Sequence, residues 1–345
     1  MNLKMMFSKR VHLPFLAVLV LVLSGCSAVT ELSPIQNQKP IEVNSISGHE
    51  GGNGPVLVVK IDDTPEAHPQ IGLEDADCVY IEQVEGGLTR LAAVFSSRIP
   101  ELIGPIRSAR ISDIDLLAQY GKVAFAYSGA QSKLLPVIAS SGMLDLGAQH
   151  ESPLIYTRDA TRSAPVDMVL RAQDLMEKLK SQKADIANAK EMGWEFSDEP
   201  LGGKKISSVT MNWPANSYSA NWSEQESRWL LNYHGVENVS ASGLILGPTT
   251  LVIQVVSIID STYRDKMGGI TPLSITVGSG QGFVLRDGKA FRARWIRPNA
   301  QEQTRWTLED GNPLPFAPGQ IWVALVASAP DFTYPAESAS PSATK

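Results

Sequence analysis

Two arginines three residues apart are the clearest candidates for chemistry in this chain. Arg107 and Arg110 precede a predicted helix that begins near Ser112. A guanidinium group presents a planar fork of donors that matches a carboxylate or a phosphate, and free N–H groups at a helix start also attract anions. We therefore expect a site for a polar or anionic ligand. Its expected ligand-binding residues are Asp62, Asp63, Glu85, Arg90, Arg107, Ser108, Arg110 and Ser128.

An internal ion network is the competing interpretation of the same arginines. In that case Asp62, Glu82 or Glu85 neutralises the guanidinium groups, and no charge is left for a guest. Asp113 and Asp115 in the first turn of the predicted helix also compete for its positive end. Both interpretations stay open on the sequence alone.

Glu82 and Glu85 suggest a second kind of chemistry. Two carboxyl groups can serve as general acid and general base when burial separates their pKa values. Both residues lie at or beside a predicted hairpin turn at Gly86 and Gly87, where the backbone can approach a ligand. A catalytic role for Glu82 and Glu85 is thus the alternative hypothesis.

Several other functions are disfavoured by the composition. The five histidines are isolated, with no cysteine or histidine at ligand spacing, so we expect no metal site. The sequence has no P-loop and no dinucleotide fingerprint, so we expect no cofactor. A formal net charge of -6 argues against a nucleic-acid partner.

The N-terminus has the pattern of an export signal. Lys4, Lys9 and Arg10 precede an apolar stretch at 11–23, which is shorter than the roughly 20 residues of a membrane span. The stretch ends in Leu-Ser-Gly-Cys, which is similar to the lipobox of bacterial lipoproteins. We expect residues 1–26 to be a signal peptide and Cys26 to carry acyl chains such as palmitate, which anchor the protein to the membrane.

The elements that must position these side chains alternate in type only in the first half. Strands predicted at 56–61, 78–84, 91–96 and 122–127 are interspersed with helical patterns, whereas short strands between Gly, Pro, Asn and Asp turns fill the second half. The sequence predicts an α+β fold class, with an N-terminal mixed α/β domain followed by a β-rich C-terminal domain. The predicted divisions are a flexible tether at 27–54, the α/β domain at 55–180, a linker at 181–203, the β-rich domain at 204–330 and a loose tail at 331–345.

Three motifs in order carry a resemblance to a known family. They are Ile-Asp-Asp at 61–63, Val-Glu-Gly-Gly-x-Thr-Arg at 84–90, and Gly-Pro-Ile-Arg-Ser-Ala-Arg at 104–110. Together they resemble the YerB-like bacterial lipoproteins, over about residues 55–326. The resemblance implies an exported envelope lipoprotein with an N-terminal and a C-terminal domain of unknown function, and it implies no reaction. Family members commonly have histidines in the loops at 126–129 and 164–167, and this chain lacks them.

These observations lead to one expected function and two alternatives. We expect a lipoprotein anchored through Cys26 on the extracytoplasmic face of the cell membrane, which binds a polar or anionic cell-envelope ligand. Its expected partners are the membrane and a cell-wall polymer or cell-wall protein. The alternatives are a cell-wall hydrolase or transferase that uses a carboxylate acid and base, and a non-enzymatic regulator of a cell-wall enzyme.

Overall fold

The computed structural model describes residues 41–197 and 200–335. The expected signal peptide, the acylated Cys26 and most of the expected tether lie outside these residues.

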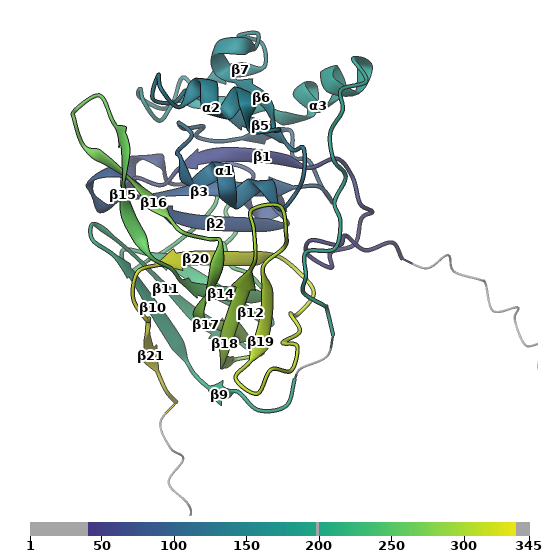
Figure 1. The fold of residues 1–345 in the computed structure, drawn as a ribbon, viewed down its shortest axis with the longest axis vertical. Helices are drawn as coiled ribbons and strands as arrows, with labels where there is room; N and C mark the ends of the chain where they lie inside the picture. Colours follow the sequence, from purple (N-terminus) through teal and green to yellow (C-terminus); the bar gives the residue numbers. More distant parts are fainter. Residues whose placement is uncertain (1–40, 198–199, 336–345) are drawn as a thin grey trace, which may run out of the picture. The chain divides into compact units, whose positions relative to one another are not determined.

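A large mixed sheet draws its strands from both halves of the sequence (Figure 1). β20 from the C-terminal half pairs in parallel with β2 from the N-terminal half, so the sheet is continuous across the expected division at 181–203. Its order is β19-β18-β17-β14-β20-β2-β3-β1-β5-β6, and β9 pairs with β18. The strands are β1 (Leu57–Asp62), β2 (Cys78–Gln83), β3 (Thr89–Phe95), β5 (Ala124–Tyr127), β6 (Leu144–Gly147), β9 (Lys204–Lys205), β14 (Thr250–Val255), β17 (Gly278–Arg286), β18 (Lys289–Arg297), β19 (Arg305–Leu308) and β20 (Ile321–Val326).

Three smaller sheets complete the β structure. The five-stranded sheet comprises β10 (Ser208–Trp213), β11 (Asn216–Ser223), β12 (Arg228–Tyr233), β13 (Val236–Glu237) and β21 (Asp331–Thr333). A two-stranded hairpin is formed by β15 (Ile258–Arg264) and β16 (Ile270–Ser274), and a third sheet by β4 (Leu102–Ile103), β7 (Tyr156–Arg158) and β8 (Met168–Arg171).

Helices are few, which corrects part of the expected fold class. Strands account for 41% of the described residues and helices for 12%, so the α+β class fits loosely and the N-terminal half is not clearly a mixed α/β domain. The α-helices are α1 (Ser112–Ala118), α2 (Leu135–Ser140) and α3 (Ala172–Ser181). The short 3-10 helices are η1 (Pro65–Ala67), η2 (Leu73–Asp75), η3 (Glu85–Gly87) and η4 (Ala148–His150).

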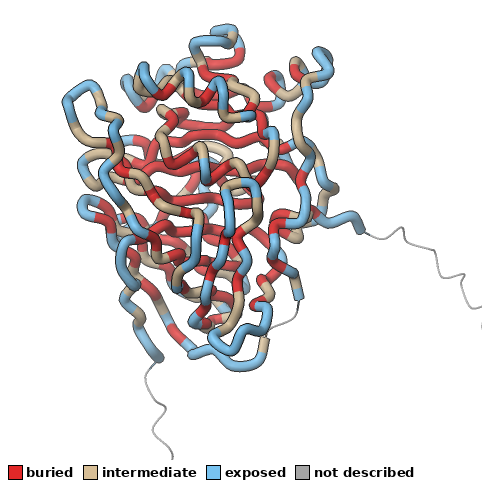
Figure 2. The backbone as a smooth tube through the Cα atoms, viewed as in Figure 1, coloured by how far each residue is buried: buried red, intermediate tan, exposed pale blue. Residues whose placement is uncertain are grey.

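The central strands β1, β2 and β3 are buried on both faces (Figure 2). Because side chains alternate along a strand, each strand contributes to two hydrophobic layers. One layer packs against the five-stranded sheet and α3, and the other packs against α1 and α2. This second layer contains Val58, Tyr80 and Ala92, and the strand alternation places the charged side chains described below on the same face.

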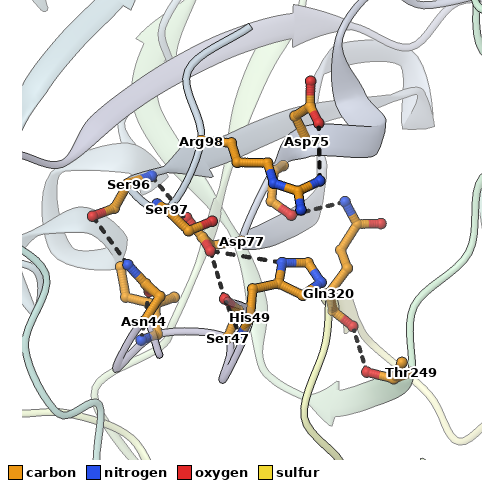
Figure 3. A network of polar contacts seen from close by, with 12 residues as sticks. Asn44, Ser47, His49, Asp75, Asp77, Ser96, Ser97, Arg98, Thr249 and Gln320 are labelled. Atoms are coloured by element: carbon orange, nitrogen blue, oxygen red, sulfur yellow. Dashed lines mark hydrogen bonds and ion pairs between the residues drawn. The ribbon is translucent and has the colours of Figure 1, made fainter. Parts of the chain in front are cut away.

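Residues 41–54 differ from the flexible tether that their composition predicts. Asn44, Ile46 and Ser47 are fully buried. The buried Asp77 carboxylate accepts the Ser47 hydroxyl at 2.5 Å and the backbone N–H groups of residues 96 and 97 at 2.7 and 2.8 Å (Figure 3). A buried carboxylate needs such donors, and part of this set comes from the segment that composition alone marks as loose.

The expected linker and tail also make defined contacts. Trp194 stacks on Phe316 with ring centroids 5.2 Å apart and donates a 3.0 Å hydrogen bond to the backbone oxygen of Ile46. Residues 331–333 form β21, which pairs with β10. Aromatic packing and strand pairing thus order segments that are polar in composition.

Candidate functional site

A row of charged side chains crosses three central strands. The register pairs Arg90 of β3 with Asp62 of β1 on one side and with Glu82 of β2 on the other. Directly paired residues project to the same face of a sheet. Lys60, two residues before Asp62, joins them on the α1 side.

Lys60 is fully buried and forms ion pairs with two carboxylates. Its Nζ contacts Glu82 and lies 2.9 Å from Oδ1 of Asp113 at the start of α1. Burial lowers the pKa of Lys60 to about 8, although the charge of Asp113 opposes the change. All three side chains are inaccessible to solvent, so this triad is structural.

The two arginines of the 104–110 motif are both partly neutralised. Nε of Arg107 lies 2.5 Å from Oδ2 of Asp62, in an ion pair that lacks hydrogen-bond alignment. Arg110 binds one oxygen of Glu85 with two nitrogens, at 2.9 and 2.7 Å. The ion-network interpretation therefore holds for this pair of arginines.

Glu85 is held in its ionised form. Burial raises the pKa of this carboxyl, but the hydrogen bonds and charge of Arg110, together with the Thr271 hydroxyl, outweigh burial and bring the pKa below its usual value. A general acid needs a pKa near the working pH, so this environment does not suit Glu85 to that role.

Arg90 is the exception among these cations. This row and its neighbours contain four cations and four carboxylates, but Lys60 forms ion pairs with two of the carboxylates. Within the described residues Arg90 has no carboxylate at ion-pair distance, its Nη1 donates only to the Ser108 backbone oxygen at 3.3 Å, and its Nε has no hydrogen-bond partner. Burial, with repulsion from Arg110 and Arg107, lowers the pKa of Arg90 to about 9, so the group stays charged at neutral pH. The eight groups are Lys60, Arg90, Arg107, Arg110, Asp62, Glu82, Glu85 and Asp113.

Arg90 lines an open cleft of about 690 Å³, which we call the cationic cleft. Its walls come from both halves of the chain, since the hairpin β15–β16 supplies one side. The hydroxyls of Ser108, Ser128 and Ser132 line it and have no hydrogen-bond partner within the described residues. The lining residues are Val84, Glu85, Leu88, Arg90, Arg107, Ser108, Ala109, Arg110, Ser128, Ala130, Gln131, Ser132, Leu134, Tyr263, Arg264, Asp265, Lys266, Met267 and Thr271.

The start of α1 is not accessible to a ligand, although the sequence predicted that its N–H groups would attract an anion. Ser112 is fully buried and its hydroxyl accepts the N–H of Ser274 in β16 at 3.0 Å. The helix has no side-chain cap at Ile111, and Oδ2 of Asp113 accepts the Arg110 N–H at 2.7 Å. The Ser112 hydroxyl is therefore engaged by β16, and Asp113 itself takes the N–H group that precedes the helix, so neither is available to a ligand.

The described residues contain neither a metal cluster nor a membrane-spanning helix. Between residues 41 and 335, apart from 198–199, no cluster of three or more metal-ligating side chains occurs. No helix in that part of the chain has the length and apolar character to cross a bilayer.

The chain matches a family defined in two parts. Residues 44–185 match "Protein of unknown function (DUF3048) N-terminal domain", and residues 209–323 match the corresponding C-terminal domain. The chain belongs to this family. The cationic cleft takes Arg90 from the N-terminal region and the β15–β16 hairpin from the C-terminal region.

Two comparisons with individual proteins agree with this assignment. The chain is 26% identical over 292 residues to "Putative lipoprotein YerB" of Bacillus subtilis (strain 168). This alignment covers 79% of this chain and 81% of that protein. The crystal structure of the YerB protein from Bacillus subtilis superimposes with a TM-score of 0.71 at 20% identity, over 83% of this chain and 97% of that chain. The expected family resemblance is confirmed, and the second comparison shows that the fold is shared.

The structure divides the expected site residues into two groups. Glu85, Arg90, Arg107, Ser108, Arg110 and Ser128 all line the cationic cleft, and Asp62 lies behind it, paired with Arg107. Glu82 does not line the cleft, because Lys60 holds it in the interior.

Asp63 lies on the opposite face of the sheet from the cleft. Its fully buried carboxylate accepts hydrogen bonds from Tyr218 at 2.6 Å, from Asn216 at 3.3 Å and from Thr89. Two of these donors belong to β11 of the C-terminal half, so Asp63 joins the two family regions instead of reaching a ligand.

Sequence reasoning missed the hairpin wall and the buried lysine. Tyr263, Lys266 and Thr271 stand more than 150 residues from Arg90 in the sequence, and no local pattern connects them. Lys60 sits in an apolar strand beside two carboxylate-bearing segments. A lysine in a strand buried on both faces was the available signal, because such a group is almost never buried without a partner.

Proposed function

We propose that this chain is a lipoprotein anchored on the extracytoplasmic face of the membrane, and that it binds a polar or anionic cell-envelope ligand in the cationic cleft. The name of the Bacillus subtilis relative supports the lipoprotein assignment, as does the export pattern that ends at Cys26. The state of Arg90 carries the binding assignment.

A buried charge without a counter-ion is costly, which makes Arg90 informative. Native proteins pair nearly all buried charges, and an unpaired donor costs free energy that a hydrogen bond would recover. Here the neighbouring arginines have partners while Arg90 does not, although it lines a space that a guest can enter. An anion bound there would supply the missing acceptor, and the unengaged serine hydroxyls would supply further donors.

Titration calorimetry with inorganic phosphate and with acetate tests this proposal on the detergent-solubilised full chain. We expect saturable binding of at least one of these anions, weakened about tenfold or more in Arg90→Met, because a charge-assisted hydrogen bond contributes roughly 1.5–3 kcal/mol. Arg90→Lys keeps the charge but loses the fork, so it should fall between Arg90→Met and the parent.

Arg98→Ala is the matched control, since this exposed arginine lies outside the cationic cleft. It should bind the anions as the parent does. The proposal fails if the parent binds neither anion, or if a folded Arg90→Met binds them unchanged.

The enzyme alternative draws little support from the carboxylates. Glu82 is sealed beside Lys60, and the pKa of Glu85 is shifted away from the range that suits proton transfer at neutral pH. Regulation of a cell-wall enzyme stays an untested prediction, and a pull-down dominated by one such enzyme would favour it.

A further inference from the structure

The β15–β16 hairpin forms one wall of the cationic cleft. It is a separate two-stranded sheet, seen in Figure 1 as a long green hairpin that extends from the C-terminal half toward the N-terminal strands. Two contacts hold it: Ser274 at its base donates to the Ser112 hydroxyl, and Thr271 near its tip donates to Glu85. The hairpin is therefore attached to the same segments that carry the arginines.

The tip of the hairpin has a defined turn, which the carboxylate of Asp265 stabilises. Oδ1 of Asp265 accepts the N–H groups of Met267 at 2.9 Å and Gly269 at 2.7 Å. Arg264 donates to the Gly268 backbone oxygen at 3.1 Å. Neither Arg264 nor Lys266 has an ion pair within the described residues, so both cations remain available in the cleft wall.

The charges that line the cleft are unbalanced. Five cationic side chains face two carboxylates, in a protein whose formal net charge is -6. One of the carboxylates binds Arg110 and the other closes the hairpin turn. The cations without a carboxylate partner occupy two walls, with Arg90 on the sheet and Arg264 and Lys266 on the hairpin.

A ligand with a single charge would leave one of these walls unused. A monocarboxylate has two acceptor oxygens and satisfies Arg90 alone. A row of phosphates carries a charge and several acceptor oxygens on each group, which matches a guanidinium group on the sheet, a guanidinium and an ammonium group on the hairpin, and unengaged serine hydroxyls in the same lining.

We propose that the cationic cleft binds a ligand with at least two consecutive phosphate groups, one on Arg90 and the next on Arg264 and Lys266 of the hairpin. This inference rests on the proposed function and names the ligand class of the same site. Consecutive phosphates occur both in a diphosphate head group and in a phosphodiester chain, and two probes separate these sources.

Titration calorimetry of the full chain at constant ionic strength tests the inference with inorganic phosphate, pyrophosphate and a glycerol phosphate trimer. We expect pyrophosphate or the trimer to bind at least about tenfold more tightly than phosphate. Tighter binding of pyrophosphate points to a diphosphate source, and tighter binding of the trimer points to a phosphodiester chain.

The hairpin variant Arg264→Ala/Lys266→Ala should bind the preferred probe roughly three- to thirtyfold more weakly, and its preference over phosphate should shrink, since each removed cation is exposed and screened. The control Arg292→Ala/Arg305→Ala removes two equally charged, exposed side chains elsewhere and should keep the parent preference.

Two outcomes overturn the inference and are distinguishable. If phosphate binds through Arg90 but the hairpin variant keeps the full preference for the longer probes, or no preference exists, the hairpin has no part in recognition and only this inference fails. If no anion binds the parent chain, the proposed function fails with it.

Discussion

Asp62 and Asp63 are neighbours in the sequence, yet they belong to two very different regions of the molecule. Asp62 faces the cleft side of the sheet and meets one partly exposed arginine, Arg107, without hydrogen-bond alignment. Asp63 faces the other side, where side chains from both family regions enclose it, among them Thr89 and Tyr218, with the His68 ring 3.3 Å away. The cleft side leaves one cation, Arg90, without a carboxylate partner beside an open space, whereas the junction side surrounds its carboxylate with hydrogen-bond partners.

This difference indicates where the molecule can accommodate a guest. A cation that lines open space without a counter-ion can take an added anion as its acceptor. A buried carboxylate with several donors cannot be removed without leaving those donors unsatisfied. We therefore expect substitutions in the junction to affect folding and substitutions in the cleft to affect binding.

The largest expected effect is the loss of stability in Asp63→Ala. This change leaves Tyr218, Asn216 and Thr89 without their buried acceptor, so we expect the free energy of unfolding to fall by about 3 kcal/mol or more. Urea-induced unfolding measures this free energy. The control Asp185→Ala removes an exposed partner of Lys122 and should cost less than about 0.5 kcal/mol; equal effects of the two changes would contradict the comparison.

Asp77→Ala should have a smaller and more local effect. The change removes the acceptor of the Ser47 hydroxyl and of the N–H groups of residues 96 and 97, and we expect a loss of about 2 kcal/mol. Hydrogen exchange should speed up at residues 44–49 and 96–97 before it does in the central strands. Uniform acceleration of hydrogen exchange over the whole sheet would show that residues 44–49 do not detach separately from it.

The smallest effect should be the pH dependence contributed by Glu85. Its pKa lies below the usual value in the folded chain, so its contribution to stability is full above the unfolded value of about 4.5 and is lost as the pH falls through the folded pKa. We expect the stability difference between the parent and Glu85→Gln to be at most about 1 kcal/mol at pH 7 and to vanish at acid pH. A difference that grows on acidification would contradict this assignment.

The sequence predicted local structure well and long-range packing poorly. The Asp-Gly pair at 287–288 predicts a two-residue hairpin turn, and the turn between β17 and β18 has the positive φ that such a hairpin requires at Asp287 and Gly288. Apolar residues at helical spacing between residues 163 and 180 predict a single helix there, which is only partly correct, because residues 168–171 form β8 against β4 and β7. Helical spacing of apolar residues does not reveal a strand partner elsewhere in the chain.

The candidate site shows the same limit. The motif at 104–110 and the strand ends at Asp62 and Arg90 suggested that the charges converge, because neighbouring strands carry them. The face on which Asp62 and Asp63 each lie depends on register, which composition does not specify. The contact between Thr271 and Glu85 joins residues 186 positions apart, so only the folded chain reveals the hairpin wall.

Diffraction from a crystal of the protein soaked in selenate, a tetrahedral dianion with a strong anomalous signal, tests whether Arg90 binds an anion. We expect an anomalous peak in the cationic cleft within hydrogen-bond distance of the Arg90 guanidinium group. A cleft without a peak, in crystals where selenate occupies other surface sites, would contradict this expectation.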